Sequence, residues 1–204
     1  MPEPSVRDAH EGGFTSPVFD AQAVFRAIME AMARRGTVWP LPAQASAPEP
    51  LTPAMAALLL TVCDADTPVW FDAAASSAET DAWLRFHTGA PIASEASEAA
   101  FAVIADATLL GTVERFALGT PDYPDRSTTL LVQVASLTGG MRLVLEGPGI
   151  QDSALIAPGG LPDRITDIWA ANNALFPRGV DLVFAALDAI AALPRTTRVR
   201  TGEN

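Results

Sequence analysis

Two short stretches of the sequence combine side chains that could hold a phosphate group. The first is Pro194-Arg195-Thr196-Thr197-Arg198, which places two guanidiniums and two hydroxyls in a stretch without a helical pattern. Guanidinium groups bind phosphate oxygens through a planar fork of N–H donors. Two interpretations stay open. Either Arg195 and Thr196 bind a phosphate-bearing ligand, or the arginines of this stretch meet the acidic surface of the protein itself.

The second stretch, Leu84-Arg85-Phe86-His87-Thr88-Gly89, forms the last turn of a predicted helix. An imidazole in that position can interact with terminal carbonyls and with the helix dipole, which gives His87 a structural role. In the alternative, Arg85 and His87 hold an anion and His87 carries a proton. Side chains two positions apart on a helix point in different directions, so this pairing requires the helix to have ended already.

Two further patterns favour structural turns over ligand sites. Asp64 and Asp66 bracket a turn, and two carboxylates alone make a weak cation site, so we interpret them as turn caps. Gly147-Pro148-Gly149 is superficially similar to a phosphate cradle, but its proline lacks an amide donor and no helix follows directly. The chain has two histidines, and one of them, His10, lies in the N-terminal tail. We therefore predict no metal site, and we assign no catalytic residue.

All thirteen basic side chains are arginines, and the 204 residues include no lysine. Alanine, proline and glycine are abundant as well, so a GC-rich coding bias accounts for the composition. Its chemical consequence holds whatever the cause. Without a lysine amine, the chain cannot form a Schiff base with pyridoxal phosphate or a carbonyl substrate, and it cannot build a Walker-type phosphate loop.

Charge and hydropathy restrict the possible partners further. A formal net charge of -11 argues against binding to nucleic acids and to anionic membranes. The lone Cys63 excludes a disulfide framework and a cysteine metal cluster, and its apolar neighbours indicate a small core residue. The N-terminus shows no signal-peptide pattern, and no apolar run approaches about 18 residues. We expect a soluble, cytoplasmic protein.

Alternating helical and extended patterns predict the elements that would position these residues. Helices are predicted for Asp20–Arg35 with Gly36 as its end, from Pro53 through Cys63, and for Ser77–Thr88, Thr108–Leu118 and Asp163–Asn173. Strands are predicted for Pro68–Asp72, Phe101–Ala105 and Val180–Ala185, and Leu187–Leu193 for a short helical or irregular connection. The order predicts an α/β domain in which helices cover both faces of a mixed sheet.

The clearest local signal predicts a β-hairpin. Thr128–Leu137 and Met141–Glu146 are β-rich runs joined by Thr138-Gly139-Gly140, whose glycines can supply the positive φ angles of a tight turn. Residues 1–16 are polar and rich in turn formers, so we expect a mobile N-terminal tail followed by a single domain over residues 17–204.

Seven segments in order resemble one known family. They are Asp20-Ala21-Gln22 with Phe25-Arg26 and Gly36; Leu60-Thr61 with Asp64 and Thr67-Pro68-Val69-Trp70; Leu84-Arg85-Phe86-His87-Thr88-Gly89-Ala90-Pro91; Gln133-Val134-Ala135-Ser136-Leu137 before Gly139-Gly140; Gly147-Pro148-Gly149-Ile150; Phe176-Pro177-Arg178-Gly179-Val180-Asp181-Leu182; and Pro194-Arg195-Thr196-Thr197. No single segment is specific, but the ordered set, over about residues 17–199, resembles the PhnH family of the bacterial carbon–phosphorus (C–P) lyase system.

The resemblance implies a fold, partners and a role. The implied fold is a three-layer α/β/α sandwich similar to the pyridoxal-phosphate-dependent transferases but without the cofactor, with which the missing lysine agrees. The implied partners are PhnG-, PhnI- and PhnJ-like subunits, with a homodimer when the chain is alone and no iron–sulfur cluster on this chain. The implied role is that of an accessory subunit where methylphosphonate displaces adenine from ATP, giving ribose 1-methylphosphonate 5-triphosphate.

The resemblance supplies no catalytic residues, so the ligand-binding candidates Arg85, His87, Arg195 and Thr196 rest on their chemistry alone. An alternative hypothesis stays open beside the accessory role. In it, the chain is a stand-alone phosphate-ester or nucleotide enzyme that uses Arg85, His87 and Arg195.

Overall fold

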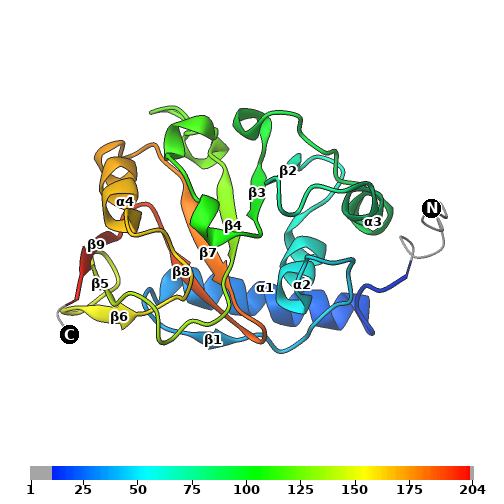
Figure 1. Cartoon of the computed structure of the whole chain (residues 1–204), viewed down its shortest axis with the longest axis horizontal. Coiled ribbons are helices and arrows are strands. Elements are labelled where there is room, and N and C mark those ends of the chain that lie inside the picture. Colours follow the sequence, from blue (N-terminus) through cyan, green and yellow to red (C-terminus); the bar gives the residue numbers. More distant parts are fainter. Residues whose placement is uncertain (1–10, 203–204) are drawn as a thin grey trace.

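The computed structural model describes residues 11–202, and within that range a six-stranded mixed sheet forms the centre of the molecule (Figure 1). Its strand order is β1-β8-β7-β4-β3-β2. Neighbours β2, β3, β4 and β7 pair in parallel, whereas β8 and β1 add antiparallel strands at one side. The strands are β1 (Trp39–Pro40), β2 (Val69–Phe71), β3 (Phe101–Ile104), β4 (Thr129–Gln133), β7 (Asp181–Ala185) and β8 (Ala189–Leu193). The predicted α/β class with a mixed sheet is confirmed.

One face of this sheet is covered by the helices α1 (Pro17–Ala33), α2 (Pro53–Val62) and α3 (Ala78–Thr88). Helix α2 lies deepest, and its Met55, Leu58 and Leu59 are fully buried among the residues of this core. The three helices agree with the predicted ones within a few residues at each end.

The opposite face packs against helix α4 (Ile165–Ala174), short 3₁₀ turns and a second sheet of three strands. In that sheet β5 (Leu143–Glu146) lies between β6 (Ala154–Ile156) and β9 (Arg198–Thr201), and both pairings are antiparallel. Strand β4 separates the two cores, because Leu131 faces α1–α3 whereas Leu130 and Val132 face the α4 side. Burial on both faces is typical of parallel strands.

Local capping signals explain where two of the helices begin. The side chain of Thr52 accepts a hydrogen bond from the backbone N–H of Met55 at 3.3 Å, ahead of Pro53 in the first turn of α2. Ser77 caps α3 in the same way through the N–H of Thr80 at 3.1 Å. Helix α3 ends at Gly89, whose φ of 75° places it in the left-handed region that suits glycine.

The predicted hairpin is wrong. Strand β4 pairs with β3 and β7 in the large sheet, whereas β5 pairs with β6 and β9 in the small one. Gly140 belongs to a turn that packs closely on another loop, because a Cβ there would lie 2.0 Å from the carbonyl oxygen of Pro158. A glycine pair marks a turn, but the choice of partner strands depends on which faces must be buried.

Two other local predictions are also wrong. Thr108–Leu118 is not a helix; the chain there forms two 3₁₀ turns, Ala107–Leu109 and Val113–Arg115, which are separated by Leu110, Gly111 and Thr112. Leu187–Leu193 contains β8, which pairs with β7 and places its alanines in both cores. Alanine has a weak strand preference, so burial in the sheet overrides local propensity here.

The predicted N-terminal tail lies partly within the described residues. Met1–His10 lie outside them. Gly13 exchanges backbone hydrogen bonds with Ser46 at 2.9 and 3.4 Å, and Phe14 packs against the α1–α3 core. This short segment therefore rests on the body of the protein before α1 begins.

Candidate functional site

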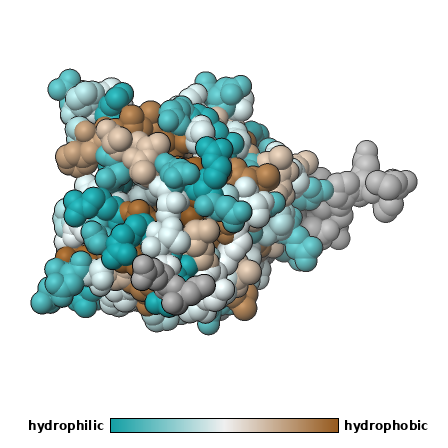
Figure 2. Space-filling model, turned by 60° about the vertical axis from the view of Figure 1, so that its left-hand side comes forward, coloured by the Kyte–Doolittle hydropathy of each residue, from teal (hydrophilic) through white to brown (hydrophobic). Residues whose placement is uncertain are grey.

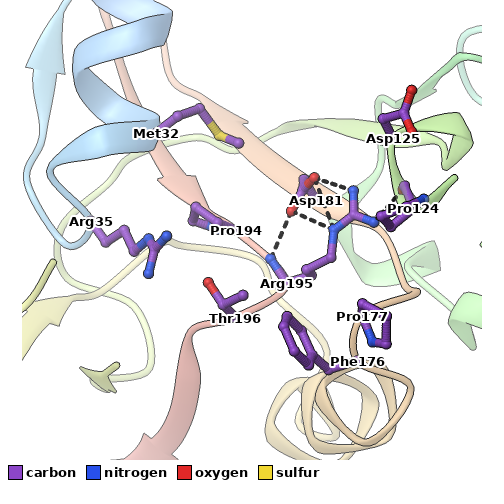
Figure 3. A pocket seen from close by; sticks show the side chains of 10 residues that line it. All are labelled: Met32, Arg35, Pro124, Asp125, Phe176, Pro177, Asp181, Pro194, Arg195 and Thr196. Atoms are coloured by element: carbon purple, nitrogen blue, oxygen red, sulfur yellow. Dashed lines mark hydrogen bonds and ion pairs between the residues drawn. The ribbon is translucent and has the colours of Figure 1, made fainter. Parts of the chain in front are cut away.

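A pocket of about 440 Å³ opens between the end of α1, the turn before β4, the end of α4 and the segment after β8 (Figure 3). It contains two of the four predicted ligand-binding residues, Arg195 and Thr196. Its walls are formed by Met32, Arg35, Pro124, Asp125, Phe176, Pro177, Asp181, Pro194, Arg195 and Thr196.

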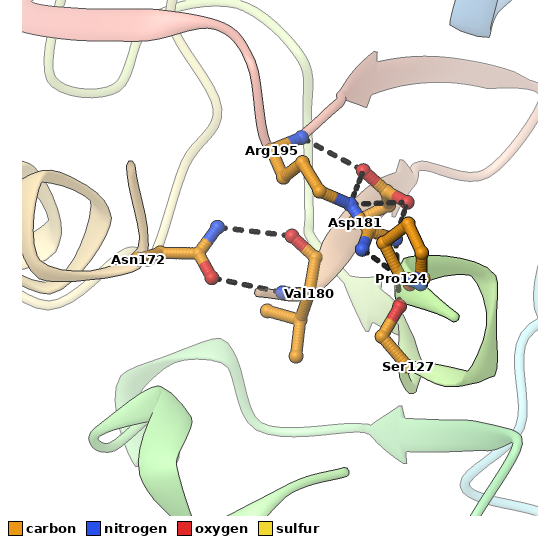
Figure 4. A network of polar contacts seen from close by, with 6 residues as sticks. All are labelled: Pro124, Ser127, Asn172, Val180, Asp181 and Arg195. Carbon is orange, nitrogen blue, oxygen red and sulfur yellow. Dashed lines mark hydrogen bonds and ion pairs between the residues drawn. The ribbon is translucent and has the colours of Figure 1, made fainter. Parts of the chain in front are cut away.

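The guanidinium of Arg195 is engaged by ion-pair and hydrogen-bond contacts within the protein. Its Nε lies 3.2 Å from both carboxylate oxygens of Asp181, and its Nη2 forms an ion pair with the same group. Nη1 donates to the carbonyl of Pro124 and Nη2 to the hydroxyl of Ser127, both at 2.6 Å (Figure 4). The exposed fractions of the two charged side chains are 13% and 16%. Arg195 therefore braces the pocket wall and has little donor capacity left for a ligand.

Arg35, just beyond the end of α1, is the second guanidinium of the pocket, and it is not among the residues predicted from the sequence. Its Nη1 donates to the carbonyl of Pro148, but its Nε is buried without a hydrogen-bond partner in the described chain. No carboxylate of the described residues lies within ion-pair distance of it, in contrast to Arg34, which pairs with Glu30 at 3.0 Å. A buried donor without a partner lowers stability by about 1–3 kcal/mol. The Nε of Arg35 is therefore a donor whose hydrogen-bonding capacity the described residues leave unused.

Thr196 is the second residue of the pocket with a polar atom that the described chain leaves unpartnered. Its Oγ1 is buried and has no partner within residues 11–202. The rest of the wall is largely apolar, with Met32, Pro194 and the exposed Phe176, whose exposed fraction is 62%. Figure 2, which turns the α4 side of the molecule forward, shows hydrophobic surface interspersed with hydrophilic residues on this side.

The loop Gly147-Pro148-Gly149 ties the two sides of the pocket together. Gly147 has a φ of 135°, and a Cβ there would lie 2.9 Å from the carbonyl oxygen of Thr196. Gly149 has a φ of 83°, and its Cβ would lie 3.3 Å from the carbonyl oxygen of Ala33 in α1. The interpretation of this motif as a structural turn is confirmed by the Ile150 N–H, which bonds to the Gly147 carbonyl at 3.1 Å.

Helix α4 fixes the backbone that carries the candidate residues. Trp169 donates from Nε1 to the carbonyl of Thr197, and Asn173 donates to the carbonyl of Arg195, both at 2.8 Å. Asn172 bonds with both its amide atoms to the backbone of Val180, at 2.8 and 2.9 Å (Figure 4). Asn172 thus holds α4 to the start of β7, next to Asp181.

Arg85 and His87 lie elsewhere, on α3 beside the β2 edge of the sheet (Figure 1). The His87 ring packs against Trp83 and Phe86, with ring centroids 5.1 and 5.0 Å apart, and lies against Gly13. Arg85 follows Asp81 by one turn. Burial raises the pKa of Asp81, and the charge of Arg85 partly offsets that rise. The two residues diverge on the helix, and the structure does not bring them to the pocket of Arg195.

Asp64 and Asp66 belong to a turn, as the sequence predicts. The Asp66 N–H donates to Oδ1 of Asp64 at 3.0 Å, and the Thr67 hydroxyl donates to the same oxygen at 3.1 Å. Within the described part of the chain, no three histidine, cysteine or acidic side chains converge as metal ligands would. Across the same residues, no helix has both the length and the apolar character needed to cross a bilayer.

Arg35 could have been found by one signal only. Arg34 and Arg35 follow the last apolar position of the first predicted helix. Arg34 can form an ion pair with Glu30 one turn earlier, whereas Arg35 has no acidic residue at that spacing. Chemically, the pocket offers the guanidinium of Arg35, the hydroxyl of Thr196, the exposed carboxylate of Asp125 and apolar walls. The guanidinium and the hydroxyl can hold an anion.

Comparisons with known proteins agree with the resemblance of the ordered motifs. Residues 12–200 match the family described as "Bacterial phosphonate metabolism protein (PhnH)". The chain is 48% identical over 190 residues to the alpha-D-ribose 1-methylphosphonate 5-triphosphate synthase subunit PhnH of Rhizobium meliloti (strain 1021), covering 93% of this chain and 95% of that protein. It is 35% identical over 109 residues to a putative C-P lyase subunit protein, HtxG, of Stutzerimonas stutzeri, covering 53% of this chain and 55% of that protein. The chain therefore belongs to the PhnH family of bacterial phosphonate metabolism proteins.

Proposed function

We propose that this protein is an accessory subunit of a C–P lyase core complex in phosphonate catabolism. The observation that carries the proposal is its 48% identity, over nearly the whole of both chains, to a relative named as a subunit of ribose 1-methylphosphonate 5-triphosphate synthase. The protein supports the transfer of methylphosphonate to the ribose of ATP with release of adenine. The guanidinium of Arg35 and the hydroxyl of Thr196 can hold an anion, which suits a supporting role.

The proposal includes the assembly and the surroundings of the subunit. Its partners are PhnG-, PhnI- and PhnJ-like chains, and alone it forms a homodimer in the cytoplasm. Its fold is similar to that of the pyridoxal-phosphate-dependent transferases, with a central mixed sheet between two covering layers. It works without pyridoxal phosphate, since a sequence without lysine has no amine to hold that cofactor.

The alternative hypothesis, a stand-alone enzyme that uses Arg85, His87 and Arg195, loses its geometric basis. Arg85 and His87 lie on α3, whereas Arg195 lies in the pocket between α1 and α4. The Arg195 guanidinium is also occupied by Asp181, Ser127 and Pro124.

Co-expression with the PhnG-, PhnI- and PhnJ-like subunits tests the accessory role. With an affinity tag on the PhnI-like partner, we expect this protein to co-purify at a fixed ratio through a second, sizing step. Deletion of its gene should abolish growth on methylphosphonate but not on inorganic phosphate. Consistent purification of the protein alone, or normal growth of the deletion strain on methylphosphonate, would refute the proposal.

A further inference from the structure

We propose that the pocket between α1 and α4 binds the phosphorus oxyanion of a small phosphonate or phosphate ester, with Arg35 and Thr196 as its anchors. The choice of phosphorus ligands rests on the proposed function. The site itself rests on the two buried polar atoms that this pocket leaves without partners, Nε of Arg35 and Oγ1 of Thr196.

Arg35 is the cation that remains available in the pocket. The other guanidinium, that of Arg195, is neutralised by Asp181 and fixed by two further hydrogen bonds. Arg35 uses Nη1 to hold the carbonyl of Pro148, which anchors one end of its fork. Its Nε is buried and has no partner among residues 11–202, and the paired N–H donors of a guanidinium edge match two oxygens of a phosphorus oxyanion.

Thr196 supplies a neutral donor in the same pocket. Figure 3 shows the Arg35 side chain reaching in from the end of α1, with Thr196 on the neighbouring wall. The backbone around Thr196 is rigid, because α4 holds the carbonyls of both adjacent residues, Arg195 and Thr197. A hydroxyl on a fixed backbone can add a hydrogen bond to a bound oxyanion at little entropic cost.

The apolar walls favour an organic anion over bare phosphate. Met32, Pro194 and Phe176 line the pocket with apolar surface that bare phosphate would leave uncovered. An alkyl or aryl group on phosphorus would lie against these side chains and be removed from water. The ring of Phe176 is largely exposed and thus accessible to such a group.

Two features oppose an anion and limit its affinity. Asp125 places an exposed carboxylate at the rim, and the carbonyl end of α1 lies beside the pocket. Arg35 lies two residues beyond that helix end, so its charge offsets the negative end of the helix dipole. Affinity therefore depends on one guanidinium, and we expect it to fall as salt rises.

Calorimetric titration of the purified full-length protein tests the proposal. The probes are methylphosphonate, phenylphosphonate, inorganic phosphate and ATP, each at low and high salt. We expect phenylphosphonate to bind more tightly than inorganic phosphate. Arg35→Gln and Thr196→Val should each weaken binding by about tenfold or more, as expected for the loss of a charge-assisted or buried hydrogen bond. The matched control is Arg34→Gln, which removes an adjacent, exposed arginine paired with Glu30 and should leave binding unchanged.

Each arm of the experiment has a defined result against the proposal. It is overturned if the wild type binds no probe at millimolar concentration, if Arg34→Gln weakens binding as much as Arg35→Gln, or if inorganic phosphate binds as tightly as phenylphosphonate. Should Arg35→Gln fail to fold, Thr196→Val decides, because valine has the shape of threonine without its hydroxyl. If ATP binds more tightly than either phosphonate, the phosphate group that the pocket recognises belongs to the nucleotide.

The failure of the pocket can be distinguished from the failure of the accessory role. A wild type that co-purifies with its partners but binds no probe overturns the pocket and leaves the role intact. A wild type that binds phenylphosphonate through Arg35 but never co-purifies supports the pocket and refutes the role.

Discussion

Arg195 and Asp181 form an ion pair in which one carboxylate receives the Nε and Nη2 groups of the guanidinium and also the backbone N–H of Arg195 at 2.7 Å. The pair links the beginning of β7 to the segment after β8. Through Ser127 and Pro124, it also holds the turn that precedes β4. One carboxylate thereby sets the relative position of three segments of the pocket wall.

Replacement of Asp181 by asparagine should destabilise the protein by about 3 kcal/mol, because it leaves a largely buried guanidinium without its counter-charge. Urea denaturation of the wild type and Asp181→Asn measures this difference.

The double variant Asp181→Asn, Arg195→Gln is the control for this effect. Removal of both charges should recover part of the loss, since no unpaired charge then remains. If the free-energy changes of the two single variants simply add, the ion pair does not couple these residues and the interpretation is wrong.

Asn172→Leu should cost about 2–4 kcal/mol, because it leaves both the N–H and the carbonyl of Val180 buried without their partner. Asn173→Leu, the same substitution one position along α4, removes one principal hydrogen bond, to Arg195, and should cost about 1 kcal/mol. Thermal and urea unfolding of the two variants compare these costs. Equal losses would contradict the role of Asn172 as the main tie between α4 and β7.

Cys63 should destabilise the protein at alkaline pH. Burial, followed by the nearby charge of Asp64, raises the pKa of its thiol from 9.0 to about 12. The folded protein therefore keeps the proton while the unfolded chain loses it. Stability is unaffected below pH 9.0 and falls as pH rises from there towards about 12.

Cys63→Ala isolates this effect, since alanine does not titrate. Relative to that variant, the wild type should lose about 2 kcal/mol of unfolding free energy between about pH 8 and about pH 10.5. If the unfolding free energies of the two proteins change with pH in the same way, the fold does not raise the pKa of the Cys63 thiol. Native Cys63 should also resist alkylation at about pH 8, and urea should expose it.

Gly13→Ala should loosen the segment before α1. A Cβ at Gly13 would lie 3.0 Å from Cε1 of His87, at a φ of 90°. Gly139→Ala is the matched control, because its φ of 80° imposes a similar backbone penalty while nothing lies within 4 Å of the added Cβ. Hydrogen exchange should accelerate at the Gly13–Ser46 pairing in Gly13→Ala alone. Equal effects would exclude the contact with His87 as the cause.

The elements that the sequence predicts well carry their signals locally. Thr52-Pro53 and Ser77 are helix caps within one turn of the groups they bind, and Gly89 ends its helix by its own φ. The strands β3 and β7 are short apolar runs that can only be buried. The ordered motifs identify the family without any of this geometry.

The errors occur where partners far apart in sequence decide the outcome. Gly139-Gly140 marks a turn but cannot specify that β4 and β5 enter different sheets. The alanines of β8 form a strand only because β7 lies beside them. Arg195 looked like a ligand-binding group because Asp181, 14 positions earlier, is not a visible partner in the sequence. Arg35 was not predicted because the sequence shows that it has no acidic partner one turn earlier, but not that it lies beside a pocket.

The pocket can form only after the chain has been synthesised as far as Thr196. Its wall comes from the ends of α1 and α4, the turn before β4 and the segment after β8, and Gly147 and Gly149 contact two of these. The ribosome makes Arg35 early and Thr196 late. A nascent chain thus carries Arg35 without its site until β8 and the segment after it have been translated. Ligand binding through this pocket would report only on molecules translated beyond Thr196, and it would give no signal from chains that terminate before it.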